Sequence, residues 1–352
     1  MGLLDIFVAA LMPVLKVLLL TALGCGLAID RVDILGEDAR KHLNNVVFFV
    51  FNPALVVSNL GGFITYKSVA ILWFMPLNIL LTFIIGSVLG WMLIKYTRTP
   101  HSLRGLVLGC CAAGNLGNMP LIIIPAICKE RGSPFGAADT CYLHGMAYAS
   151  LSLAIGAIYN WSYVYNLVSI LDRVNRCLRV TLRKINPRKL FAPSTIGAIA
   201  GFAIAIIPQL RKALIGDSAP LRVLQNSASM LGDAAIPTVT IVMGANLLKG
   251  LKGSVIQLPV VMGIVAVRYV ALPMFGILIV RGGVFLGLVK LDPLYQFVLL
   301  LQFALPPAMN IATMTQMFEV GERECSVIML WTYALASVAL TFWSAFFMWL
   351  VA

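Results

Sequence analysis

Amide and proline residues gather at two points in otherwise apolar segments, and this combination is suited to binding an anion. Asn115 and Asn118 precede Pro120 in the run GNLGNMPLIIIPA, and Asn310 follows Pro306-Pro307 in LPPAMNIATMTQMF. A proline removes a backbone N–H and clashes with the carbonyl four residues earlier, so we expect each helix to open there, the first around residues 115–120. The half-helix after a break offers free N–H groups and a partial positive charge. The amides add hydrogen-bond donors without adding charge.

A break of this kind inside a membrane helix predicts a cavity. Unpaired backbone groups cost several kcal/mol each in lipid, so a break persists only where protein, water or a ligand satisfies them. We expect Asn115, Asn118 and Asn310 to contact a substrate in this cavity. The alternative interpretation is that the three amides only cap the broken helices.

Two further polar residues are candidates for ion or proton coupling. Asp233 lies four residues before Pro237, so a carboxylate sits beside a carbonyl that has lost its helical partner and could take a proton or a cation. Alternatively, Asp233 lies near the membrane interface and pairs with Lys16 or Arg268. His144 is either a proton carrier or a packed residue that makes an ordinary hydrogen bond.

The sequence contains no pattern that indicates an enzyme or a metal site. There is no HExxH motif, no phosphate-binding P-loop and no CxxC pair. Seven cysteines lie mostly in apolar runs, so we predict buried packing residues, no disulfide and no bound zinc. We also expect no cofactor. The cysteines are Cys25, Cys110, Cys111, Cys128, Cys141, Cys177 and Cys325.

The elements that position these residues must be membrane helices. The chain has 352 residues, 60% of them hydrophobic and 11% charged, and its mean hydropathy of +0.94 excludes a soluble globular protein. One crossing takes about 20 apolar residues. Ten segments qualify, and they are 5–29, 42–61, 68–94, 102–128, 140–165, 193–210, 222–248, 254–280, 292–318 and 324–350.

The ten segments form two similar halves. We predict a first five-helix repeat at 1–165, a basic linker at 166–192 and a second repeat at 193–352. Pro53 and Pro237 lie 184 residues apart in corresponding segments, as do Cys141 and Cys325. Because five crossings are an odd number, the two repeats insert in opposite orientations. The predicted fold is therefore an all-α polytopic membrane protein with a 5+5 inverted repeat, an architecture typical of secondary transporters.

The basic residues predict an orientation. In a membrane protein, the basic residues behind the net charge of +12 report which loops face the cytosol, and they do not indicate nucleic-acid binding. Loops after odd-numbered segments hold twice as many Lys and Arg residues as loops after even-numbered ones, and Lys and Arg favour the cytosol. We therefore expect the linker in the cytosol and both termini on the opposite face, in the lumen or outside.

The chain resembles a known family along nearly its whole length. The resemblance is carried by MPVLKVLLLTALG, LNNVVFFVFNPALVVSNL, GNLGNMPLIIIPAIC and LPPAMNIATMTQMF. They resemble the auxin efflux carrier superfamily and, within it, the plant PIN-LIKES proteins. This resemblance implies ten helices in which the fourth and ninth break and cross, with a scaffold domain and a transport domain. It further implies auxin, indole-3-acetic acid, as substrate, carried across the endoplasmic reticulum membrane.

By motif position, the resemblance implies a substrate site of Asn115, Asn118, Pro120, Pro307 and Asn310. The function expected is alternating-access transport with the carboxylate held at the helix crossing by the half-helix N-termini, because neither broken helix carries a cation there. The alternative is an ion- or proton-coupled transporter of another small organic anion that uses Asp233. The expected partners are the organic anion and the lipid bilayer, with homodimer formation left open.

Overall fold

The protein is helical throughout the part that the structure describes. The computed structural model describes residues 3–130, 133–164, 193–216, 218–251, 256–318 and 321–351. Within these residues the only extended pairing is one isolated bridge between Gly114 and Pro307. Six helical segments are long and apolar enough to cross a membrane, or seven if the bent pair α10 and α11 is one span. The chain is therefore an all-α polytopic membrane protein.

The helices of the first half run from α1 to the π-helical segment η3. They are α1 (Leu3–Leu27), α2 (Glu37–Val46), η1 (Val47–Phe51), α3 (Asn52–Phe63), α4 (Tyr66–Ile71), α5 (Phe74–Thr97), η2 (His101–Leu103), α6 (Arg104–Ala112), α7 (Asn118–Lys129), α8 (Ala138–Tyr159) and η3 (Asn160–Val164). The predicted linker at 166–192 lies outside the described residues.

The described helices of the second half run from α10 to α18. It comprises α10 (Pro193–Ile206), α11 (Pro208–Leu214), α12 (Arg222–Asp233), α13 (Ala235–Leu251), α14 (Leu258–Ala266), η5 (Val267–Ala271), α15 (Leu272–Phe285), α16 (Pro293–Ala304), α17 (Asn310–Phe318) and α18 (Glu322–Val351). Every predicted segment coincides with one helix or with consecutive short helices. That all ten cross the bilayer as an inverted repeat stays a prediction.

Both predicted breaks are present, and the broken segments meet. The first break lies between α6 and α7, at 113–117, which is slightly earlier than the expected 115–120. Pro120 consequently occupies the first turn of α7, where its missing N–H costs no helical hydrogen bond. The second break separates α16 from α17. The Asn115 N–H donates to the Pro306 carbonyl at 2.8 Å, and the Ala308 N–H donates to the Ala113 carbonyl at 2.9 Å.

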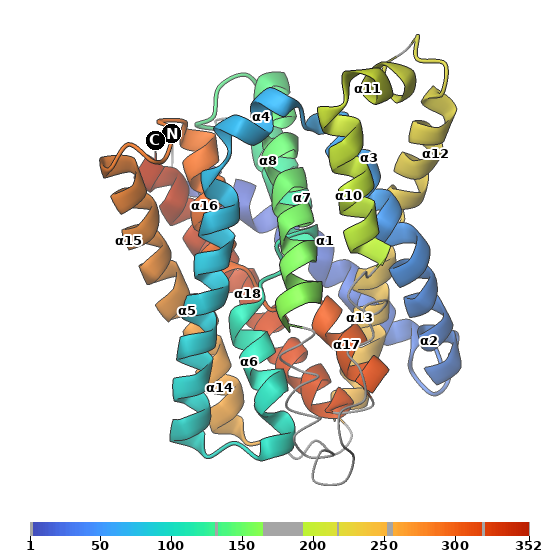
Figure 1. Cartoon of the computed structure of the whole chain (residues 1–352). Helices are drawn as coiled ribbons and strands as arrows, with labels where there is room; N and C mark the ends of the chain where they lie inside the picture. Colours follow the sequence, from blue (N-terminus) through green and yellow to red (C-terminus); the bar gives the residue numbers. More distant parts are fainter. Residues whose placement is uncertain are drawn as a thin grey trace, which may run out of the picture.

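The helices that surround the crossing pack in pairs. α1 packs against α13, α3 against α10, and α7 against α8. Figure 1 shows α3 and α10 side by side. A Cβ atom at Gly197 would lie 2.9 Å from the Pro53 carbonyl oxygen, and one at Gly201 would lie 2.8 Å from Leu60 Cβ. Only glycine allows this close approach, so these two residues set the distance between α10 and α3.

The ends of the chain lie at one end of the bundle. In Figure 1 the N and C marks share that end with α4 and α11, whereas η2, between α5 and α6, lies at the opposite end. An even number of crossings places both ends of a chain on the same side. The arrangement therefore agrees with the alternation of loops that the ten segments predict.

The expectation of no disulfide was wrong. Cys128, near the end of α7, and Cys141, in the first turn of α8, are bonded, with Cα atoms 5.5 Å apart. Their apolar surroundings suggested simple packing, but α7 and α8 are consecutive and antiparallel, so the short connection between them brings the two thiols together. Cys25, Cys110, Cys111 and Cys325 are free.

Candidate functional site

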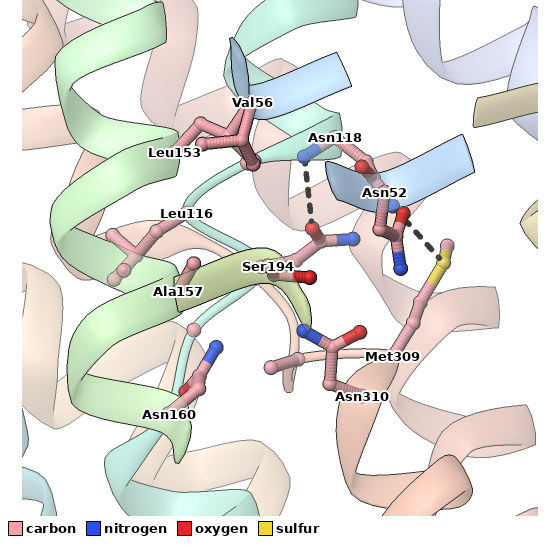
Figure 2. Close-up of a pocket in the computed structure, with 15 residues that line it drawn as sticks. Asn52, Val56, Leu116, Asn118, Leu153, Ala157, Asn160, Ser194, Met309 and Asn310 are labelled. Atoms are coloured by element: carbon pink, nitrogen blue, oxygen red, sulfur yellow. Dashed lines mark hydrogen bonds between the residues drawn. The ribbon is translucent and has the colours of Figure 1, made fainter. Parts of the chain in front are cut away.

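A small polar cavity lies at the crossing of the two broken segments. Its volume is about 40 Å³. Figure 2 shows amide and hydroxyl groups from several helices around this space. The lining residues come from α3, α8, α10, both breaks and the start of α7 and α17. They are Asn52, Val56, Gly114, Asn115, Leu116, Gly117, Asn118, Leu153, Gly156, Ala157, Asn160, Ser194, Ala308, Met309 and Asn310.

The three predicted amides all line this cavity but differ in their contacts. Asn115 is buried, its Nδ2 donates to the Tyr333 hydroxyl at 2.9 Å, and its Oδ1 accepts the Asn118 N–H at 3.2 Å. The Asn118 side chain donates only to the Met309 sulfur among the described residues, at 3.8 Å, which is a weak contact. The Asn310 side chain makes no hydrogen bond to any described residue. Asn115 therefore braces the break, whereas Asn118 and Asn310 keep donors for a ligand.

Three polar residues that the sequence analysis did not assign to the site also line the cavity. Asn52 comes from the start of α3 and Ser194 from the first turn of α10. Asn160 is 5% exposed, and its Oδ1 has no hydrogen-bond partner in the described part of the chain. The Asn-Pro pair at Asn52 and the proline just before Ser194 are helix-start signals that could have identified both. Asn160 carried no comparable signal.

The two predicted prolines shape the site without lining it. Pro120 and Pro307 are buried, and neither is among the residues that surround the cavity. Their effect is on backbone carbonyls. The Leu116 carbonyl, which Pro120 excludes from the helix, accepts the Ser152 hydroxyl at 2.9 Å, and the Pro307 carbonyl accepts the Tyr333 hydroxyl at 2.8 Å. Side chains thus satisfy the groups that the breaks release.

A second small cavity adjoins the first. It has a volume of about 30 Å³ and lies among η1, α13 and α17. Asn52, Met309 and Asn310 line both cavities and so form the wall between them. Asn44 and Asn246 add amides on the far side of this wall. The two cavities are therefore neighbours separated by this wall.

The two candidate coupling residues lie elsewhere. Asp233 is exposed at the end of α12 and lines neither cavity, and Lys16 is also exposed. Arg268 is fully buried behind the crossing, so it is not the partner of Asp233. His144 is exposed on α8 and stacks on Tyr148, with ring centroids 6.4 Å apart. Among the described lining residues of the two cavities there is no charged side chain.

Comparison with known proteins agrees with this architecture. The family described as "Membrane transport protein" matches residues 9–344. Protein PIN-LIKES 1 of Arabidopsis thaliana is 55% identical over 384 residues, which cover 100% of this chain and 81% of that protein. Protein PIN-LIKES 3 of the same plant is 52% identical over 387 residues, which cover 99% of each chain. The chain therefore belongs to the membrane transport protein family and, within it, to the PIN-LIKES proteins.

Proposed function

We propose that this protein is a secondary transporter that carries auxin, indole-3-acetic acid, across the endoplasmic reticulum membrane by alternating access. The substrate carboxylate binds where α6 and α7 cross α16 and α17. Membership in a transporter family supports transport, and the resemblance to the auxin efflux carriers supports the substrate and the membrane.

The observation that carries the proposal is the convergence of three helix N-termini on one uncharged polar cavity. Asn118 begins α7, Asn310 begins α17, and Ser194 lies in the first turn of α10. Each N-terminus contributes a partial positive charge of about half a unit. A carboxylate is the ligand that best satisfies such a site.

The size of the cavities supports a transport cycle in which the site opens and closes. A cavity of about 150 Å³ is needed to hold benzene, so neither of these two holds an indole acid as it stands. Substrate entry therefore requires movement of the wall formed by Asn52, Met309 and Asn310. Motion of the crossing segments α6–α7 and α16–α17 relative to a scaffold of α1, α3, α10 and α13 would merge the cavities and expose them in turn.

The orientation with lumenal termini has two supports. The first is the twofold excess of Lys and Arg in loops on the opposite side. The second is the disulfide between Cys128 and Cys141, which lies beside the α7–α8 connection, on the same side as the chain ends. Disulfides form in the oxidising lumen of the endoplasmic reticulum and not in the cytosol.

Proteoliposomes provide the test of transport. Purified protein should move labelled indole-3-acetic acid at about pH 7.5, where the carboxylate is ionised. Movement should need no sodium, and protein-free liposomes are the control. Absence of uptake in sodium-containing and sodium-free buffers would overturn the proposal, whereas uptake only with sodium that Asp233→Asn abolishes would favour the ion-coupled alternative.

Labelling of single cysteines tests the orientation. In a background without other reactive cysteines, His101→Cys should react with a cytosol-restricted reagent, and Val351→Cys should not. The control is labelling after the membrane has been permeabilised, when both cysteines should react. The reverse pattern in sealed membranes would reject lumenal termini.

A further inference from the structure

A fully buried arginine lies directly behind the crossing of the broken helices. Arg268 is 0% exposed and projects from the π-turn η5, between α14 and α15. Its Nη1 donates to the Cys111 carbonyl at 3.3 Å, and its Nη2 donates to the Pro306 carbonyl at 3.2 Å. One guanidinium therefore joins a carbonyl of the first broken segment to a carbonyl of the second.

This guanidinium has no acidic partner in the part of the chain that the structure describes. Its titratable neighbours are Cys110, Cys111, Tyr269 and Tyr333, and no carboxylate of the described residues is among them. Its Nε is buried and has no hydrogen-bond partner. A buried cation without a counter-ion is costly, and ionisable residues inside a membrane protein mark functional sites. The charge is therefore available to an anion that arrives from elsewhere.

Only a glycine separates the guanidinium from the polar cavity. Gly114 lines the cavity, and a Cβ atom at this residue would lie 2.9 Å from Arg268 Nη2. Any larger side chain at this position would force the guanidinium to shift. The positive charge thus reaches the cavity through a wall one backbone thick.

The carbonyl ends of the broken helices explain why such a charge is useful. α6 and α16 end at the crossing, and their terminal carbonyls carry a partial negative charge. Left alone, these carbonyls would oppose the attraction that the N-termini of α7 and α17 exert on an anion. Arg268 binds one carbonyl beside each helix end, and its positive charge offsets their negative partial charge.

We propose that Arg268 is the fixed cation that makes the crossing selective for anions, as a positioning residue that acts across Gly114 without touching the substrate. This replaces the expectation that half-helix N-termini alone hold the carboxylate. The inference rests on the proposed function only in that the transported substrate is an anion. It identifies a specificity-determining residue outside both broken helices.

Binding of indole-3-acetic acid and of its uncharged methyl ester to purified protein tests the assignment. In the unaltered protein the acid should bind more tightly than the ester. Arg268→Gln keeps hydrogen-bond donors but removes the charge, so it should weaken acid binding about ten- to hundred-fold and leave ester binding unchanged. Arg281→Gln is the matched control, because Arg281 is exposed and donates only to the Leu350 carbonyl, at 2.8 Å.

The possible results distinguish a failure of the anion site from a failure of the role of Arg268. Equal affinity of the unaltered protein for acid and ester would reject the anion site itself, and with it the proposed function. A preference for the acid that survives in folded Arg268→Gln would reject the role of Arg268 and leave the anion site standing. An equal loss for acid and ester would indicate a merely structural role and would also overturn the assignment.

If the glutamine variant does not fold, Arg268→Lys tests whether the positive charge sets the preference for the acid. Lysine keeps the positive charge but cannot reproduce the two-pronged contact of the guanidinium with both carbonyls. We expect this variant to retain the preference for the acid to within about threefold. Loss of the preference in folded Arg268→Lys would show that the contact, and not the charge, governs binding.

Discussion

Replacing Asn310 by alanine should weaken substrate binding without destabilising the protein. Asn310 begins α17 and lines both cavities, and its side chain makes no hydrogen bond to any described residue. Asn310→Ala therefore leaves no buried partner unsatisfied, and water can fill the small space that it opens. What it removes is one donor to the bound carboxylate.

The expected loss follows from the strength of that bond. A hydrogen bond to a charged group contributes about 1.5 to 3 kcal/mol, which corresponds to a roughly ten- to hundred-fold weaker Kd. Asn118→Ala should behave in the same way, because its only side-chain contact is the weak one to the Met309 sulfur. Asn115→Ala should differ, since it breaks the bond to Tyr333 and so lowers the melting temperature.

The assay compares radioligand binding with thermal unfolding for each purified variant. Asn226→Ala is a matched control, since Asn226 is exposed on α12 and lines neither cavity. The reasoning is refuted if folded Asn310→Ala and Asn118→Ala bind indole-3-acetic acid as tightly as the unaltered protein. In that case the amides would be helix caps, as the alternative interpretation holds.

Three further predictions concern the surroundings of the site. Cys128→Ser should lower stability by about 3 kcal/mol, given that the bonded cysteines are 13 positions apart in the chain, and reductant should have no further effect on its melting temperature. An unchanged melting temperature would contradict the disulfide. Tyr333→Phe removes the hydrogen bonds to Asn115 and to the Pro307 carbonyl and should lower the free energy of unfolding by about 1 to 3 kcal/mol, measured by denaturation. A loss near zero would mean that water replaces the hydroxyl. Asp233→Asn should leave the Kd for indole-3-acetic acid within about twofold, because Asp233 is exposed and lines neither cavity; a larger change in equilibrium binding would place it in the site.

Much of this protein follows from local physics that can be read in its sequence. Apolar runs of about 20 residues identify the helical segments, because a bilayer of fixed thickness requires them. Pro306-Pro307 and Pro120 predict the breaks, because a proline lacks the N–H that the helical hydrogen-bond ladder needs. Asn115, Asn118 and Asn310 are next to these breaks in the chain, so their presence at the crossing could be predicted too.

The tertiary structure alone decided which distant residues complete the site. Arg268 was one of two alternative partners considered for Asp233, but the fold carries its guanidinium to two carbonyls, 157 and 38 residues away in the chain. Asn160 reaches the cavity because α8 packs against α7, and Cys128 meets Cys141 for the same reason. Hydropathy and turn signals report the neighbours of a residue along the chain. Which helix faces which is decided by the close packing of side chains across helices, and no local pattern encodes that.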